Sequence, residues 1–116
     1  MQITVYGLSF ELTDAIERYV EGRIKLSLAT ASDRINTVSV RLADINGDRG
    51  GIDKRCRIVI WLRNSRTIVI EAVDPDLYAA VDAAASRAKE AVWRQIKRRR
   101  TLRREYANRG LRRLLA

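Results

Sequence analysis

The sequence contains no histidine and only one cysteine, Cys56, and each of these absences excludes a class of chemistry. Without histidine, the chain lacks the side chain that ordinarily titrates near neutral pH, so the Ser-His and Cys-His arrangements of nucleophilic enzymes are excluded. A zinc site would have almost nothing to be built from, and one cysteine cannot form an internal disulfide. We therefore expect a protein with no catalytic residues, no metal ion and no other cofactor.

Proline is also scarce, with one residue in 116, and long apolar runs are missing. No apolar stretch reaches the roughly 18 residues that a membrane span needs, and residues 1–7 alternate instead of forming the apolar core of a signal peptide. Apolar residues make up 47% of the chain and charged residues 32%, which is typical of a folded globule. We expect a cytoplasmic protein with one hydrophobic core and no membrane partner.

Positive charge is concentrated at the C-terminal end of the chain. Residues 1–93 contain 13 Lys or Arg and 13 Asp or Glu, whereas residues 94–116 contain ten basic residues and one acidic residue, Glu105. Nine of these ten basic residues are arginine, whose planar guanidinium suits bidentate contacts with phosphate. A segregated charge of this kind attracts polyanions by releasing their counterions. The distribution favours nucleic acid as the partner, with an acidic membrane surface as the weaker alternative.

Two periodicities predict six secondary-structure elements. Alternation of apolar and polar residues predicts strands over residues 2–6, 35–42, 55–63 and 67–73, the last two forming a hairpin. Helical spacing predicts one helix over residues 14–28, capped by Thr13, and a second that begins at Asp74-Pro75-Asp76. The fold class is therefore α+β in the order β-α-β-β-β-α, with two helices packed on one face of a four-stranded sheet, as in double-stranded-RNA-binding domains.

The second predicted helix is longer than the core it covers. Helical propensity persists to Tyr106, which gives a length of about 45 Å at about 1.5 Å per residue. We therefore predict that its basic end projects beyond an α/β domain of residues 1–100, and that residues 101–116 form a basic, Arg- and Leu-rich C-terminal extension. Apolar residues stand loosely among the arginines of this extension, in a pattern that Gly110 interrupts.

Basic residues on this helix and on the exposed face of the sheet are the candidate RNA-binding residues. Like charges at spacings of three and four repel one another in a free helix, so the cluster favours a polyanionic partner over a plain solvated face. Helical spacing places Arg87, Arg94 and Arg98 near one edge of the helix, and it places Lys89, Lys97 and Arg100 near another. The full candidate set is Arg41, Arg57, Arg87, Lys89, Arg94, Lys97, Arg98, Arg99 and Arg100.

Several other residues have two interpretations. Trp61 either stacks on a base or packs against neighbouring valines. Trp93 is expected to pack by its edge against the first strand or the first helix, with a nucleobase platform as the alternative. Cys56 is expected to be a small core residue, and Gly22, in a helix interior, is attributed to close packing.

Three aspartates lie in or beside the glycine-rich segment that follows the second predicted strand. Asp44, Asn46 and Asp48 imitate part of a calcium loop, but Arg49 and Arg55 stand where such a loop has glycine and glutamate. The three aspartates Asp44, Asp48 and Asp53 are the candidate carboxylates for a catalytic metal ion. A metal-dependent nuclease at these carboxylates is the weakest alternative function, because no rigid frame is evident around them.

Three short strings occur in the order of the predicted elements. They are Met1-Gln2-Ile3 with Glu11-Leu12-Thr13-Asp14-Ala15-Ile16, then Asp33-Arg34-Ile35-Asn36 with Val38 and Val40, and Asp76-Leu77-Tyr78-Ala79-Ala80-Val81-Asp82. Together they resemble the ribosome hibernation-promoting factor and ribosome-associated inhibitor A family in its short, single-domain form. The resemblance covers roughly residues 1 to 100 and does not extend to the Arg-rich segment from Thr101 onward.

This resemblance implies a stress factor that binds ribosomal RNA of the small ribosomal subunit. Such a factor blocks translation by occupying the channel of messenger RNA and transfer RNA, without catalysis and without a small-molecule substrate. Two alternatives remain open, a double-stranded RNA-binding module and a protein-protein adaptor whose basic tail docks on an acidic partner.

Overall fold

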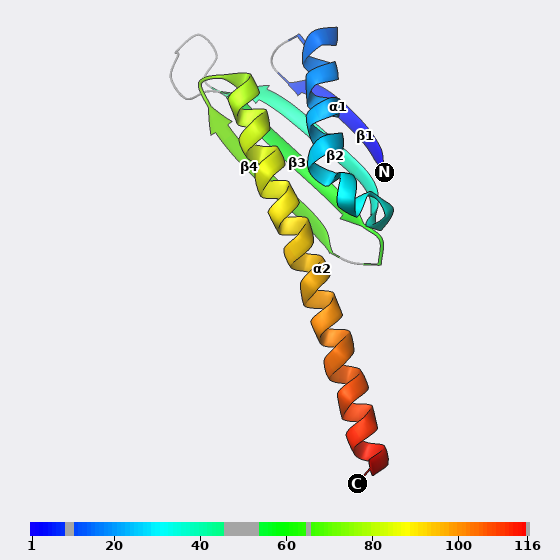
Figure 1. Ribbon diagram of the computed structural model, residues 1–116. Helices are drawn as coiled ribbons and strands as arrows, with labels where there is room; N and C mark the ends of the chain where they lie inside the picture. Colours follow the sequence, from blue (N-terminus) through cyan, green and yellow to red (C-terminus); the bar gives the residue numbers. More distant parts are fainter. Residues whose placement is uncertain (9–10, 46–53, 65, 116) are drawn as a thin grey trace.

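The computed structural model describes residues 1–8, 11–45, 54–64 and 66–115. In chain order its elements are β1 (Gln2–Leu8), α1 (Asp14–Leu28), the 3-10 helix η1 (Ala29–Arg34), β2 (Ile35–Asp44), β3 (Lys54–Leu62), β4 (Thr67–Asp74) and α2 (Leu77–Leu115). Both α-helices lie on the same face of the sheet (Figure 1). The expected class and order of elements are confirmed.

The four strands form one mixed sheet in the order β1-β2-β3-β4. β1 runs parallel to β2, while β2 with β3 and β3 with β4 are antiparallel. The register aligns Val5, Val40, Ile58 and Ile70 in one row across the sheet, on the face that the helices cover. Side chains alternate along each strand, so the residues directly before and after each member of this row point to the opposite face of the sheet. Neither helix covers that face.

Helix α1 begins and ends where its sequence predicts. The Thr13 hydroxyl accepts a hydrogen bond of 3.2 Å from the backbone N–H of Ile16, which satisfies one of the free amides of the first turn. Val20 and Ile24 on its inner face are fully buried. Gly22 is exposed, and a Cβ added there would meet no atom within 4 Å. The expectation that close packing requires this glycine is therefore wrong.

Helix α2 begins slightly later than expected. The Asp74 carboxylate accepts a hydrogen bond of 2.9 Å from the backbone N–H of Asp76, and the Asp76 carboxylate accepts one of 3.1 Å from Tyr78. Asp76 is thus the capping residue, and the first helical residue is Leu77 instead of Pro75. Asp74 and Asp76 are both suitable capping residues. Which of them caps the helix depends on the path of the chain as it leaves β4.

Four alanines bring α2 close to the sheet. Ala80, Ala84, Ala85 and Ala88 are all fully buried, so the helix backbone lies near the strands beneath it. Beyond Ile96 the helix leaves the core, and every residue from 100 to 115 is exposed.

The projecting part of α2 is longer than expected. The helix was expected to end near Tyr106 and to give way to a loose tail, but it continues through Gly110 to Leu115. Its 39 residues are about 58 Å long at 1.5 Å per residue, and the molecule is 69 Å in its longest dimension (Figure 1). A single glycine makes a helix less stable than alanine does by about 1 kcal/mol. The surrounding Arg and Leu residues are good helix formers and offset this loss.

The core beneath the helices is apolar and includes Cys56, which is fully buried as expected. Burial raises the pKa of the Cys56 thiol to about 12, because the thiolate would lose its hydration there. In the part of the chain that the structure describes, no helix is long and apolar enough to cross a membrane.

Candidate nucleic-acid interface

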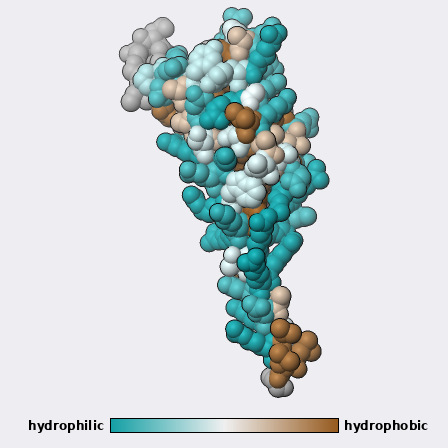
Figure 2. Space-filling view, in the orientation of Figure 1, coloured by the Kyte–Doolittle hydropathy of each residue, from teal (hydrophilic) through white to brown (hydrophobic). Residues whose placement is uncertain are grey.

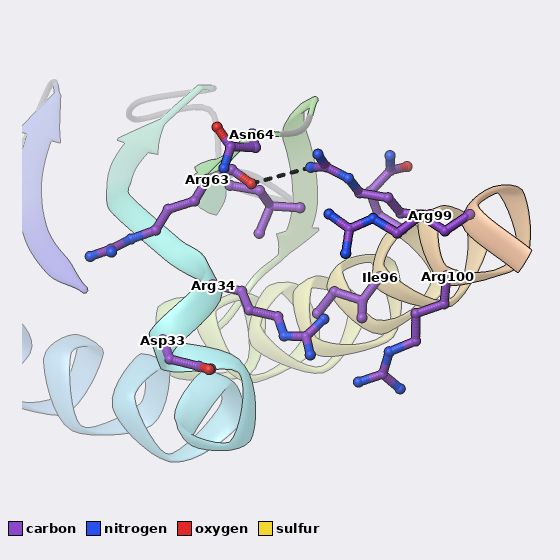
Figure 3. A pocket seen from close by; sticks show the side chains of 10 residues that line it. Asp33, Arg34, Arg63, Asn64, Ile96, Arg99 and Arg100 are labelled. Carbon is purple, nitrogen blue, oxygen red and sulfur yellow. Dashed lines mark hydrogen bonds between the residues drawn. The ribbon is translucent and has the colours of Figure 1, made fainter. Parts of the chain in front are cut away.

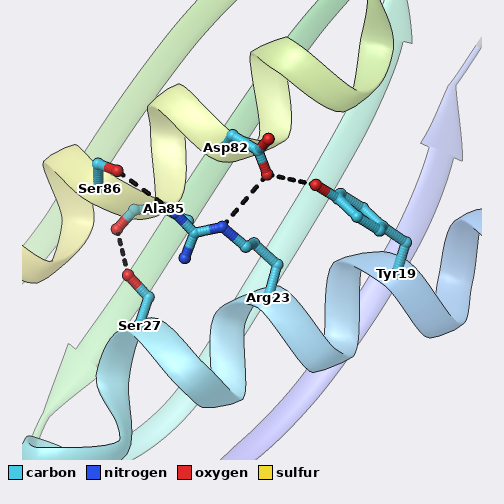
Figure 4. A network of polar contacts seen from close by, with 6 residues as sticks. All are labelled: Tyr19, Arg23, Ser27, Asp82, Ala85 and Ser86. Atoms are coloured by element: carbon cyan, nitrogen blue, oxygen red, sulfur yellow. Dashed lines mark hydrogen bonds and ion pairs between the residues drawn. The ribbon is translucent and has the colours of Figure 1, made fainter.

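A polar network fixes the relative position of the two helices. The Tyr19 hydroxyl donates a hydrogen bond of 2.6 Å to Oδ1 of Asp82, and Arg23 Nε donates one of 3.2 Å to the same oxygen (Figure 4). The ring of Tyr19 also meets that of Tyr78 edge to face, with centroids 4.8 Å apart. The hydrogen bond to Asp82, followed by burial, raises the pKa of Tyr19 above its ordinary value of 10.0.

Further along the same helix pair, Ser27 Oγ donates a hydrogen bond of 2.7 Å to the backbone oxygen of Ala85. Arg23 Nη2 lies 3.5 Å from the Ser86 hydroxyl (Figure 4). These contacts hold α1 beside α2, so the basic side chains on facing edges of the two helices keep a defined spacing.

A groove between α1 and α2 collects the first group of predicted residues. Lys89, Arg94 and Lys97 of α2 line it together with Arg23 of α1. Trp93 forms part of its wall, and the indole Nε1 donates a hydrogen bond of 3.3 Å to the Thr30 hydroxyl on η1. The hydrogen bond places Trp93 against η1, directly after the first helix, and Leu26 and Ser27 of α1 line the same groove.

A second hollow lies on the other side of α2, toward β4. Arg94 and Lys97 line it as well, together with Arg98. Helical spacing had placed Arg94 and Lys97 on different edges, but both border both hollows. The two edges are therefore joined into one basic surface, which we call the α2 basic surface and define as Lys89, Arg94, Lys97 and Arg98.

Arg87 is partly committed to the fold. Its Nη1 donates a hydrogen bond of 2.8 Å to the backbone oxygen of Glu71 in β4, which ties α2 to the edge strand. A phosphate contact by Arg87 would compete with this bond. Arg99 and Arg100 lie further along α2, where they line a third hollow beside Arg34 and Arg103.

Arg41 and Arg57 lie apart from the rest of the predicted set. They are directly paired across β2 and β3 on the sheet face that the helices leave uncovered. Arg57 Nε is 3.7 Å from the carboxylate of Glu71, an ion pair too long for a hydrogen bond. The structure therefore does not bring these two arginines together with the α2 basic surface, and a single flat RNA surface cannot touch both groups.

Trp61 lies on the same uncovered face and is 40% exposed. It stands in register between Thr37 and Thr67, with Val59 two residues along its own strand. This position accommodates both a stacked base and packing against neighbouring side chains, so both interpretations of Trp61 remain.

Figure 2 shows how the surface changes along the molecule. Hydrophilic side chains cover most of the visible length of α2, and a hydrophobic patch gathers at its C-terminal tip. Leu111, Leu114 and Leu115 are the exposed apolar residues of that tip, with exposed arginines beside them in the sequence.

The carboxylates considered for metal binding do not form a site among the described residues. No group of three or more His, Cys, Asp or Glu side chains is gathered in the described part of the chain. Asp44 forms an ion pair of 2.9 Å with Lys54, whereas Asp48 and Asp53 lie outside the described residues.

Sequence reasoning missed three basic residues that the structure adds. Arg23 reaches the groove from α1, and Arg34 and Arg103 border the third hollow. A signal for Arg23 was present, because Tyr19, Arg23 and Ser27 repeat at a spacing of four beside the apolar stripe of α1. No local pattern marks Arg34, whose neighbours in space lie about thirty residues away, on the turn after β3, and about sixty or more residues away, on α2.

Comparison with known sequences gives a family match over most of the chain. The family described as Sigma 54 modulation protein / S30EA ribosomal protein matches residues 3–101. A curated relative, the chloroplastic ribosome-binding factor PSRP1 of Spinacia oleracea, is 26% identical over 88 residues, which are 74% of this chain and 29% of that protein. The chain thus spans less than a third of the length of that relative.

Two solved structures are similar in fold. The N-terminal domain of Protein Y from Thermus thermophilus has a TM-score of 0.66 and 30% identity, over 81% of this chain and 98% of that one. A ribosomal subunit interface protein from Coxiella burnetii has a TM-score of 0.70 at 19% identity, over 81% and 96% of the two chains.

Proposed function

Because this chain belongs to the Sigma 54 modulation protein / S30EA ribosomal protein family, which includes the hibernation-promoting factors, we propose that it binds the small ribosomal subunit and inhibits translation. It does so by occupying the channel of messenger RNA and transfer RNA. The family consists of ribosome-associated factors that are not enzymes, so the protein acts by binding alone. The proposed site of action is the cytoplasm.

The α2 basic surface is the observation that carries this proposal. Arg94 and Lys97 each border two hollows, one toward α1 and one toward β4, and so present cations to both sides of the helix. Arginine and lysine bound to phosphates release counterions, which gives a sequence-independent affinity suited to ribosomal RNA. We assign ribosome binding to residues 1–100 and treat residues 101–116 as a basic extension of it.

The positions of the predicted contact residues support a proposed order of importance among them. Lys89, Arg94, Lys97 and Arg98 belong to one continuous surface and are the proposed primary contacts. Arg87 is secondary because its guanidinium already binds the Glu71 carbonyl. Arg99 and Arg100 extend the surface along α2, while Arg41 and Arg57 reach RNA only if it wraps around to the uncovered sheet face.

Co-sedimentation with purified small subunits tests the proposal. The test variant carries Lys89→Glu, Arg94→Glu, Lys97→Glu and Arg98→Glu, which reverse the four charges of the α2 basic surface. A matched control carries four reversals at exposed positions away from the groove, at Arg18, Lys25, Arg66 and Arg109, so that both proteins have the same net charge. Circular dichroism establishes that both variants are folded.

We expect the test variant to lose binding and the control to keep most of it. Wild-type affinity should fall by about 10³-fold or more between 50 mM and 200 mM salt if about six phosphates are contacted. Equal losses in the two variants would show that only net charge matters and would contradict the assigned surface. Messenger RNA and transfer RNA should displace the bound protein. If neither competes, the proposal that the protein occupies their channel is contradicted.

A further inference from the structure

A hollow lies where the end of η1, the turn after β3 and the projecting part of α2 meet. Its volume is about 270 Å³, and five of the residues that line it are arginines, Arg34, Arg63, Arg99, Arg100 and Arg103. Asp33 is the only acidic side chain among the described residues that line it. We call this hollow the arginine pocket. The proposed ribosome contact surface does not include Arg34, Arg63 or Arg103.

The arginine pocket has an apolar floor. Leu62 and Ile96 line it and are 8% and 6% exposed, so they belong to the hydrophobic core. A charged rim above an apolar floor strengthens attraction for an anion, because little water lies beneath the ligand to screen it.

Backbone contacts set the positions of the surrounding elements. The N–H of Arg63 donates a hydrogen bond of 2.9 Å to the backbone oxygen of Arg34, which joins the turn after β3 to the end of η1. Arg99 Nη1 lies 3.5 Å from the backbone oxygen of Arg63, which joins α2 to the same turn. Asn64 closes this turn with φ of 55°, a conformation that asparagine tolerates better than most residues.

The arginines differ in where their side chains point. In Figure 3, Arg34 reaches toward Ile96 from the end of η1, and Arg99 approaches from α2. The side chain of Arg63 runs away from both, so this residue contributes its backbone and not its guanidinium. The pocket is therefore assembled by guanidinium groups from two different elements.

This geometry points to a ligand with several closely spaced phosphates. A guanidinium offers five N–H donors in a planar fork and binds phosphate oxygens in pairs. One backbone phosphodiester carries a single negative charge, which would leave most of the charge of the pocket uncompensated. A phosphate monoester carries about −1.5 to −2 at neutral pH, so a diphosphate group supplies charge closer to that of the rim.

We propose that the arginine pocket is a specific binding site for a diphosphate group or an equivalent pair of adjacent phosphates. Two sources have this chemistry, a free diphosphate compound and neighbouring phosphates of a folded RNA. The site needs no ribosome to be filled, and its existence is independent of the proposed translational function.

Isothermal titration of the whole chain with sodium pyrophosphate tests the site. The pocket variant carries Arg34→Gln and Arg103→Gln. The matched control carries Arg63→Gln, which removes a side chain that points away from the pocket, and Arg109→Gln, further out on α2. Both variants lose two arginines, one near the sheet and one on α2, and their thermal melts show whether they fold like the wild type.

We expect one pyrophosphate to bind per chain, at least ten times more tightly than inorganic sulfate. The pocket variant should bind at least ten times more weakly than the wild type, and the control should stay within about a factor of two. Binding of several pyrophosphates with similar affinity, or equal weakening of the two folded variants, would overturn the proposal, because both results describe diffuse attraction to a basic surface.

A second experiment distinguishes a free diphosphate compound from neighbouring phosphates of ribosomal RNA as the ligand. Pyrophosphate at saturation should displace the chain from small subunits if ribosomal phosphates fill the pocket. If a free diphosphate compound is the ligand, pyrophosphate should bind the ribosome-bound chain equally well. If the chain does not bind subunits at all, the proposed function fails while the titration of the pocket still gives its own result.

Discussion

Tyr19→Phe tests whether the network between α1 and α2 holds the helices in place. The substitution removes one hydroxyl and leaves the ring, which meets Tyr78 edge to face with centroids 4.8 Å apart. The lost hydrogen bond is 2.6 Å long and ends on Asp82, a carboxylate that also binds Arg23.

The expected loss in the free energy of unfolding depends on how far the acceptor, the Asp82 carboxylate, is exposed to water. A hydrogen bond to a charged group contributes about 1.5–3 kcal/mol when it is protected from water. The Asp82 side chain is 46% exposed, so water competes for its oxygens and we expect about 1 kcal/mol for this bond. For a domain of this size the melting temperature should fall by roughly 4 °C.

The pH dependence gives a sharper version of the same prediction. The hydrogen bond to Asp82, and then burial, raise the pKa of Tyr19 in the folded chain above 10.0. The protonated hydroxyl is thus favoured by folding, and its contribution is complete below pH 10 and declines as the pH rises through the raised pKa. The stability difference between wild type and Tyr19→Phe should be constant from pH 7 to pH 9 and smaller at pH 11.

Urea unfolding at several pH values, followed by circular dichroism, measures this difference. A cycle with Asp82→Ala isolates the coupling, because the effect of Tyr19→Phe should nearly vanish when the carboxylate is absent. The reasoning is refuted if Tyr19→Phe is as stable as the wild type at pH 7, or if its cost is the same with and without Asp82.

Three further predictions concern the core and the helices. Gly22→Ala should increase stability by up to about 1 kcal/mol in urea unfolding, because the position is helical and a Cβ there meets nothing within 4 Å; a loss would indicate a contact that the structure lacks. Ala84→Leu should cost about 1–3 kcal/mol, since this fully buried alanine sets the distance between α2 and the sheet, and a neutral result would mean that the helix moves freely there. Burial raises the pKa of Cys56 to about 12, so the native chain should not react with a thiol reagent at pH 8 and should react fully in denaturant, whereas rapid native reaction would place the thiol at the surface.

Residue patterns within short windows predicted most of the fold. Alternation located four strands, and their observed bounds differ from the prediction by no more than two residues at either end. Thr13 was identified as the cap of α1 and makes the expected bond. The predicted start of α2 was wrong because Asp74 and Asp76 can both cap a helix and the sequence does not choose between them. Its predicted end was wrong because the loss of helix stability at Gly110 is too small to end the helix.

The candidate site was predictable only in part. The sequence identified the basic residues of α2 because charge and helical spacing are properties of one segment. It did not reveal that Arg94 and Lys97 border two hollows, since that depends on where α1 and β4 lie beside the helix. It placed Arg41 and Arg57 on the exposed face of the sheet, as observed, but it listed them in one RNA-binding set with residues of α2, which lies on the other face.

The sequence by itself determined the order of elements, the faces that are apolar, and the concentration of positive charge in the last 23 residues. Each of these follows from interactions between residues that are close along the chain. The tertiary structure alone decided that Arg34 and Arg99 meet at one pocket, because their distance depends on how closely four buried alanines let α2 approach the sheet. Packing between elements is a property of the whole core, and no short stretch of sequence specifies it.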